Sequence, residues 1–111
     1  MAYCPSSGDI IWLDFLQPIG NEQGGRRPAL VLSPRAFNAL TGRCMACPIT
    51  SHDRDWKLQA LIPEGCEITG VVQTDQLRSA SWEERGARFI CRAPAAVLEE
   101  VGAKLRALLE L

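Results

Sequence analysis

The chain lacks several features that mark membrane and secreted proteins. Its 111 residues contain no apolar run near the roughly 20 residues that a membrane-spanning helix needs, and the N-terminus has no signal-peptide pattern. Its five cysteines are an odd number, which excludes a complete disulfide framework. Linkers and internal repeats are absent. We expect one domain, residues 1–111, of a cytoplasmic protein without a membrane partner.

Lysine is also scarce: ten of the twelve cationic residues are arginine, and the net charge is −1. A global basic field for nucleic acid is therefore missing, although arginine suits bidentate contacts with phosphate. A codon bias toward arginine would explain the same composition.

The one paired cysteine motif is Cys44-Met45-Ala46-Cys47, in a segment typical of a strand. Residues three apart on a strand point to opposite faces, so these thiols are not placed to share a metal or a disulfide. We expect both to be buried as small apolar side chains, with no metal site and no cofactor.

The remaining pattern predicts a mainly β fold. Strands are expected at residues 9–15, 28–33, 43–50, 57–62, 70–74 and 87–91, with a short helix at 35–42 and a turn with a helical piece at 75–86. We expect Trp12 in the core and Pro28 at the first position of its strand. After Pro94, apolar residues at helical spacing predict an amphipathic helix: Val97, Leu98, Val101, Leu105, Leu108 and Leu109. Many short strands and one terminal helix indicate a small bent sheet or barrel.

The long connection at residues 16–27 is the first candidate site, because loops without secondary structure often carry function. Its glycines permit close approach to a ligand. Glu22 is a candidate base, and Arg27, before the rigid Pro28, can present its guanidinium to a phosphate. An exposed ion pair between Glu22 and Arg26 or Arg27 is the alternative.

Two further clusters contain polar residues. Thr50, Ser51 and His52 follow the third strand; a Ser-His-Asp triad is excluded, because neighbours in an extended chain point apart, and we expect His52 at the surface. Asp75 and Gln76 can read base edges or cap a helix, and capping is the simpler role for Asp75.

Four segments, in this order, resemble the MazF/PemK family of toxin endoribonucleases: "GDIIWLDFLQPIGNEQGGRRPALVLSP" at 8–34, "PITS" at 48–51, "VVQTDQLRS" at 71–79 and "RGA" at 85–87. The resemblance implies a small SH3-like β-barrel with helices and a homodimer. It also implies metal-independent, ribosome-independent cleavage of single-stranded RNA, often messenger RNA, at short sequences, and inhibition by a MazE-like antitoxin.

The family's reaction is attack of the 2′-hydroxyl on the neighbouring phosphate, which leaves a 2′,3′-cyclic phosphate and a 5′-hydroxyl. The resemblance implies that Arg27 stabilises the transition state, Glu22 takes or positions a proton, and Thr50 orients the phosphate. It implies RNA binding by Asn21, Gln23, Arg26, Ser51, Asp75, Gln76 and Arg78.

Two other functions fit a fold of this kind. A CcdB-like gyrase poison would end in Trp-Gly-Ile, whereas this chain ends in Leu108-Leu109-Glu110-Leu111. An inactive barrel that binds an antitoxin-like peptide is the other alternative, because a motif is a hypothesis until the site geometry supports it.

Overall fold

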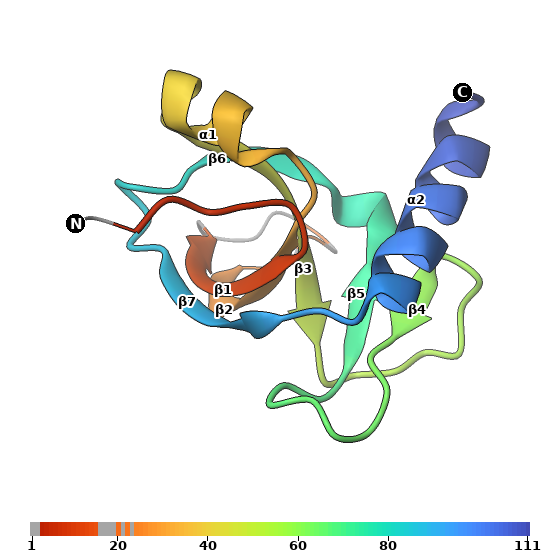
Figure 1. The fold of residues 1–111 in the computed structure, drawn as a ribbon. Helices are drawn as coiled ribbons and strands as arrows, with labels where there is room; N and C mark the ends of the chain where they lie inside the picture. Colours follow the sequence, from red (N-terminus) through yellow and green to blue (C-terminus); the bar gives the residue numbers. More distant parts are fainter. Residues whose placement is uncertain (1–2, 16–19, 21, 23) are drawn as a thin grey trace.

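The computed structural model describes residues 3–15, 20, 22 and 24–111. Its elements are β1 (Asp9–Phe15), β2 (Gly25–Val31), α1 (Arg35–Thr41), β3 (Arg43–Thr50), β4 (Gln59–Leu61), β5 (Val71–Gln73), the 3-10 turn η1 (Thr74–Gln76), β6 (Arg78–Ser81), β7 (Arg88–Arg92) and α2 (Ala95–Leu109). The strands form one strongly bent antiparallel sheet in the order β4-β5-β3-β2-β1-β7, with β6 beside the first half of β3 (Figure 1). The expected mainly β fold with a C-terminal amphipathic helix is confirmed.

The two faces of the bent sheet pack two separate cores. In β1, Ile11, Leu13 and Phe15 belong to the first core, whereas Ile10 belongs to the second. Trp12 lies on the face of Ile10 but outside the second core, and it is 37% exposed. The prediction of a core tryptophan is therefore wrong, because the apolar cluster under α2 ends before this position.

Strand β3 contributes a cysteine to each core. Cys44 packs in the first core and Cys47 in the second, and both are fully buried. Burial raises the pKa of Cys44 to about 11 and that of Cys47 to about 12. The prediction that these thiols are buried on opposite faces is confirmed.

The second core lies under α2, whose Val97 and Val101 are buried against the sheet. The predicted stripe is therefore confirmed over its first turns, while Leu108 and Leu109 are exposed. Within the described part of the chain, none of the helices has the length and apolar character needed to cross a membrane.

Two strand predictions need correction. Strand β2 begins at Gly25 rather than Pro28, because its pairing with β1 continues to Phe15. Pro28 is thus its fourth residue, and it is tolerated there because the ladder to β3 starts only at Ala29. Strand β6 was expected as turn and helix; its small polar residues have low strand propensity, and pairing with β3 overrides that preference.

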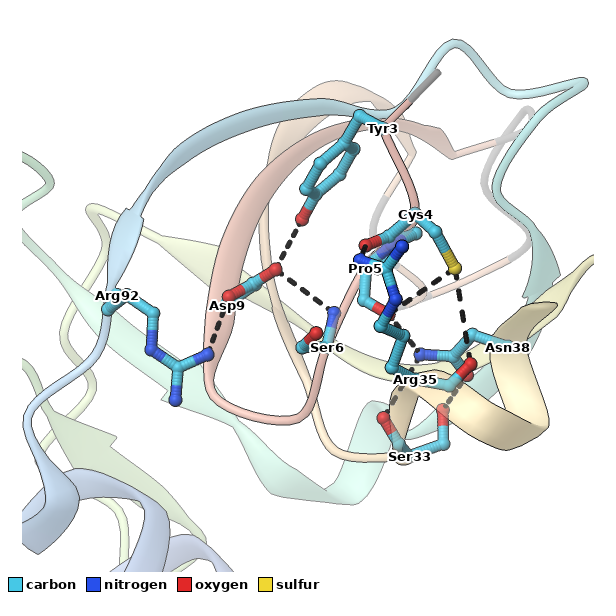
Figure 2. Close-up of polar contacts among 9 residues, drawn as sticks. All are labelled: Tyr3, Cys4, Pro5, Ser6, Asp9, Ser33, Arg35, Asn38 and Arg92. Atoms are coloured by element: carbon cyan, nitrogen blue, oxygen red, sulfur yellow. Dashed lines mark hydrogen bonds and ion pairs between the residues drawn. The ribbon is translucent and has the colours of Figure 1, made fainter. Parts of the chain in front are cut away.

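A buried carboxylate ties the N-terminal segment to the sheet (Figure 2). Asp9 is 4% exposed and accepts hydrogen bonds from the Tyr3 hydroxyl at 2.5 Å and the Ser6 amide at 3.0 Å. Its other oxygen accepts from the Arg92 guanidinium at 2.7 Å. The carboxylate fixes the start of β1 against β7, because each of its oxygens has a donor.

Asn38 of α1 plays the same part on the other side of this segment (Figure 2). Its amide nitrogen donates to the carbonyls of Pro5 and Ser33, at 2.9 and 3.0 Å. Its side-chain oxygen accepts from the Ser33 hydroxyl at 2.6 Å, and its backbone carbonyl accepts from the Trp82 indole at 2.9 Å. A fully buried amide is thereby satisfied, and α1 is held against the first core.

Candidate active site

An open cavity of about 590 Å³ brings together Arg27 of β2 and Thr50 of β3. The β2–β3 ladder explains this, because its pairs end at Ala29 opposite Pro48. Arg27 and Thr50 each lie two residues beyond this last pair, so both side chains are on the same side of their strands as Ala29 and Pro48. The other lining residues are Pro28, Ile49, Ser51, His52, Arg54, Glu67, Ile68 and Thr69.

Within the part of the chain that the structure describes, Arg27 is anchored through one nitrogen. Its Nε donates to the carbonyl of Gly24 at 3.0 Å, which fixes the side chain where β2 begins. The ion pairs between described residues do not involve Arg27. As far as the described residues are concerned, its terminal nitrogens are therefore available for an anion in the cavity, where a guanidinium fork suits a phosphate.

Thr50 is placed as a hydrogen-bond donor. Its Oγ1 accepts from the His52 amide at 3.1 Å, which leaves its own hydrogen for another acceptor. Thr50 is 8% exposed, and the β4–β5 loop passes directly behind it. A Cβ on Gly70 would lie 2.3 Å from the Thr50 carbonyl oxygen, so this backbone approach requires glycine.

Glu22 lies elsewhere. It lines a separate cavity of about 250 Å³ with Asp75, Gln76, Leu77 and Arg78. The guanidinium of Arg78, one of these lining residues, lies over the Phe15 ring at 5.3 Å from its centroid. The structure thus places Arg27 and Thr50 in one cavity and Glu22 with the Asp75 cluster in another.

The other predicted residues divide in the same way. Ser51 shares the cavity of Arg27, whereas Arg26 lines a third cavity with Trp12, Arg88 and Phe89 and donates to the Gly86 carbonyl at 3.1 Å. Asn21 and Gln23 lie outside the described residues. Asp75 sits inside η1, whose cap position is Gln73 and which has no side-chain capping bond, so the capping prediction is wrong.

Sequence reasoning missed the lining residues Arg54, Glu67 and Thr69, which come from two loops. His52 is exposed as expected, and it also lines the cavity. The β4–β5 loop lies beside Thr50 because Val71, the residue that follows the loop, pairs with Thr50, and no local pattern reveals this pairing. In the described ranges, no three His, Cys, Asp or Glu side chains gather as ligands for a metal ion.

Comparisons with known proteins agree with this architecture. Residues 6–109 match the family described as "PemK-like, MazF-like toxin of type II toxin-antitoxin system". The endoribonuclease toxin MazF of Escherichia coli (strain K12) is 37% identical over 107 residues, which cover 96% of each chain. The endoribonuclease toxin ChpB of the same strain is 38% identical over 108 residues, covering 93% of this chain and 92% of its own.

Solved structures match over the full length. The Form-I crystal structure of MazF from Deinococcus radiodurans has a TM-score of 0.95 and 45% identity, and covers 99% of this chain and 100% of its own. A Form-II crystal structure of MazE-MazF from the same organism has a TM-score of 0.90 and 45% identity, and covers 99% of both chains. These matches confirm the MazF-like fold, and the chain belongs to the PemK/MazF family of endoribonuclease toxins of type II toxin–antitoxin systems.

Proposed function

We propose that this chain cleaves single-stranded RNA, messenger RNA included, at a short sequence and without a ribosome, and that a MazE-like antitoxin inhibits it. The observation that carries the proposal is the cavity that Arg27 and Thr50 line together. The endoribonuclease names of its relatives and the MazE-MazF structures support the activity and the partner. All five cysteines are free, which suits a protein of the reducing cytoplasm.

The proposed reaction is attack of a 2′-hydroxyl on the adjacent phosphorus. The 2′-hydroxyl gives up its proton, the bond from phosphorus to the 5′-oxygen breaks, and the leaving oxygen takes up a proton, so the products are a 2′,3′-cyclic phosphate and a 5′-hydroxyl. Arg27 binds the nonbridging oxygens, whose negative charge grows in the transition state. Thr50 donates its hydroxyl hydrogen to the same phosphate and holds it for in-line attack.

The proton acceptor for the 2′-hydroxyl has more than one candidate. Glu22 is the residue implied by the family motif, but it lines the neighbouring cavity. The side chains lining the cavity of Arg27 and Thr50 that can accept a proton at neutral pH are His52 and Glu67. Replacing Glu22, Glu67 and His52 singly with Gln identifies the acceptor, because its loss lowers kcat and removes one limb of the pH–rate profile.

Arg78, Asp75, Gln76 and Glu22 form the second part of the proposed RNA-binding surface. The amide and carboxylates have the donors and acceptors that recognise exposed base edges in single-stranded RNA, and Arg78 supplies a cation for the backbone. Ser51 belongs to the first cavity and Arg26 to the outer face of β2. Asn21 and Gln23 complete the proposed set.

The test is incubation of the purified protein with long single-stranded RNA and EDTA, followed by sequencing of the fragment ends. We expect clustered cuts with 2′,3′-cyclic phosphate ends, and a decrease in rate of about 100- to 1,000-fold for Arg27→Ala. Arg43→Ala is the matched control, because Arg43 lies at the opposite end of β3 from Thr50. Equal rates for the two variants would contradict the role of Arg27.

We further propose that the homodimer forms through Trp12 and Phe89, which are 37% and 49% exposed on the adjacent strands β1 and β7. Exposed aromatic residues are common anchors of interfaces. Trp12→Ala should therefore weaken dimerisation in sedimentation velocity. Trp56→Ala, which truncates another exposed tryptophan, should leave it unchanged.

A further inference from the structure

The loop between β3 and β4, residues 51–58, forms one wall of the cavity with His52 and Arg54. It starts directly after Thr50 and ends directly before Gln59, the first residue of β4. The backbone of this loop therefore lies beside Thr50, and the His52 amide contacts the Thr50 hydroxyl.

The side chain of Gln59 makes two hydrogen bonds to the backbone of this loop. Gln59 is buried, at 8% exposure, and its Oε1 accepts a hydrogen bond from the Arg54 amide at 2.9 Å. Its Nε2 donates to the carbonyl of His52 at 3.4 Å. One buried amide thus connects two backbone groups of the loop that lie two residues apart.

The chain of hydrogen bonds continues to the catalytic threonine. The carbonyl of His52 accepts from Gln59, and the amide of His52 donates to Thr50 Oγ1 at 3.1 Å. When the His52 amide occupies the acceptor side of the Thr50 hydroxyl, the hydroxyl hydrogen is directed elsewhere. The cavity with Arg27 is where that hydrogen can meet a phosphate oxygen.

We infer that Gln59 is a positioning residue for the RNA-cleavage reaction: through the backbone of His52 it aims the hydroxyl of Thr50 at the scissile phosphate. The inference rests on the proposed function, and in particular on the proposed role of Thr50. Gln59 itself does not line the cavity and touches no reacting atom.

The chemistry of the contact requires an amide. Gln59 donates one hydrogen bond and accepts another, and an ionised carboxylate only accepts. Two other contacts of the loop do not involve the Gln59 side chain. The backbone N–H of Gln59 donates to the Trp56 carbonyl at 2.9 Å, and the backbone N–H of Asp55 donates to the Asp53 carboxylate at 2.7 Å. The local fold of the loop is therefore expected to survive the substitution.

The first experiment compares Gln59→Met with the unsubstituted protein on an RNA with one cut site. Methionine has a similar shape and neither hydrogen bond. We expect kcat to fall about 10-fold or more with KM nearly unchanged, because a misplaced group costs rate rather than binding. Thermal unfolding of both proteins identifies a temperature at which each is fully folded, and the rates are measured there.

The second experiment uses Gln59→Glu, which makes the same contacts only when protonated. A carboxylic acid has one donor and one acceptor, and burial raises its pKa. The kcat ratio of Gln59→Glu to the unsubstituted protein should therefore rise as the pH falls from about 8 to about 5. The ratio cancels the titration of His52, Asp53, Asp55 and Glu67, and the same ratio for Gln59→Met should stay flat.

The outcomes separate this inference from the proposed function, with Thr50→Val as the reference. If Thr50→Val is slow and Gln59→Met is as fast as the unsubstituted protein, the inference is wrong and the proposed function stands. The inference is also wrong if Gln59→Met has a low kcat while the kcat ratio of Gln59→Glu does not change with pH. The rate would then depend on the packing of the Gln59 side chain and not on its hydrogen bonds. If Thr50→Val cuts at full rate, the role of Thr50 and the inference fail together.

Discussion

Replacement of Gly70 by alanine tests the contact behind the active site. Gly70 has φ of +129°, a conformation that L-residues rarely adopt, and this strain costs about 1–3 kcal/mol. The new Cβ would lie 2.3 Å from the Thr50 carbonyl oxygen, whereas real Cβ contacts stay beyond 3.0 Å. The two backbones must separate by about 0.7 Å, and such overpacking costs a further 1–3 kcal/mol or so.

We therefore expect Gly70→Ala to lower the free energy of unfolding by about 2–6 kcal/mol. It should also slow RNA cleavage, because the displaced strand end carries Thr50 away from Arg27. Gly65→Ala is the control in the same loop: Gly65 has φ of +97°, but its Cβ would meet nothing within 4 Å. That variant should lose about 1–3 kcal/mol through strain alone and keep its activity.

Urea unfolding gives the two free energies, and initial cleavage rates on one RNA give the activities. The reasoning is refuted if Gly70→Ala is no less stable than Gly65→Ala and cuts RNA equally fast. In that case the contact with the Thr50 carbonyl would not constrain the site.

Other expectations concern the buried polar and thiol groups. Asp9→Asn should lower the free energy of unfolding by about 1–3 kcal/mol, measured in urea, because an amide nitrogen then faces either the Tyr3 or the Arg92 donor. Iodoacetamide near pH 8 should alkylate the partly exposed Cys66 in the folded protein and leave the buried Cys44 and Cys47 unmodified until unfolding, as mass spectrometry of peptides can show. The pKa values of Cys44 and Cys47 are raised in the fold, so the unfolded chain loses these thiol protons at a lower pH than the folded protein does. Tm should therefore fall as the pH rises above about 9. A constant Tm up to about pH 11 would contradict the burial of the two thiols.

Elements with a strong apolar pattern could be predicted from the sequence. Strand β1 and helix α2 carry periodic apolar residues, so local sequence and packing agree. Strand β6 has small polar residues, and the start of β2 has a glycine and two arginines. These two segments become strands only because a paired neighbour supplies the hydrogen bonds, and single-sequence patterns do not contain that pairing.

The candidate site shows the same division. The family motif marked Arg27 and Thr50, and the structure places both in the lining of one cavity. The motif gives no distances, so the separation of Glu22 from Arg27 had to come from the structure. Gln59 had no signal in the sequence, because a buried glutamine acts through contacts with a loop rather than through a motif.

The position of β3 has a consequence for how the molecule opens. This strand pairs with β2, β5 and β6, and its Cys44 packs in one core while its Cys47 packs in the other. Unfolding of one core would remove β3 from the other core as well, so a state with only one core folded is not stable. We expect the protein to lose both cores in a single cooperative step. In native-state hydrogen exchange, the backbone amides of β3 should then exchange only through global unfolding. Amides of β3 near Cys44 and amides near Cys47 should give the same free energy of exchange.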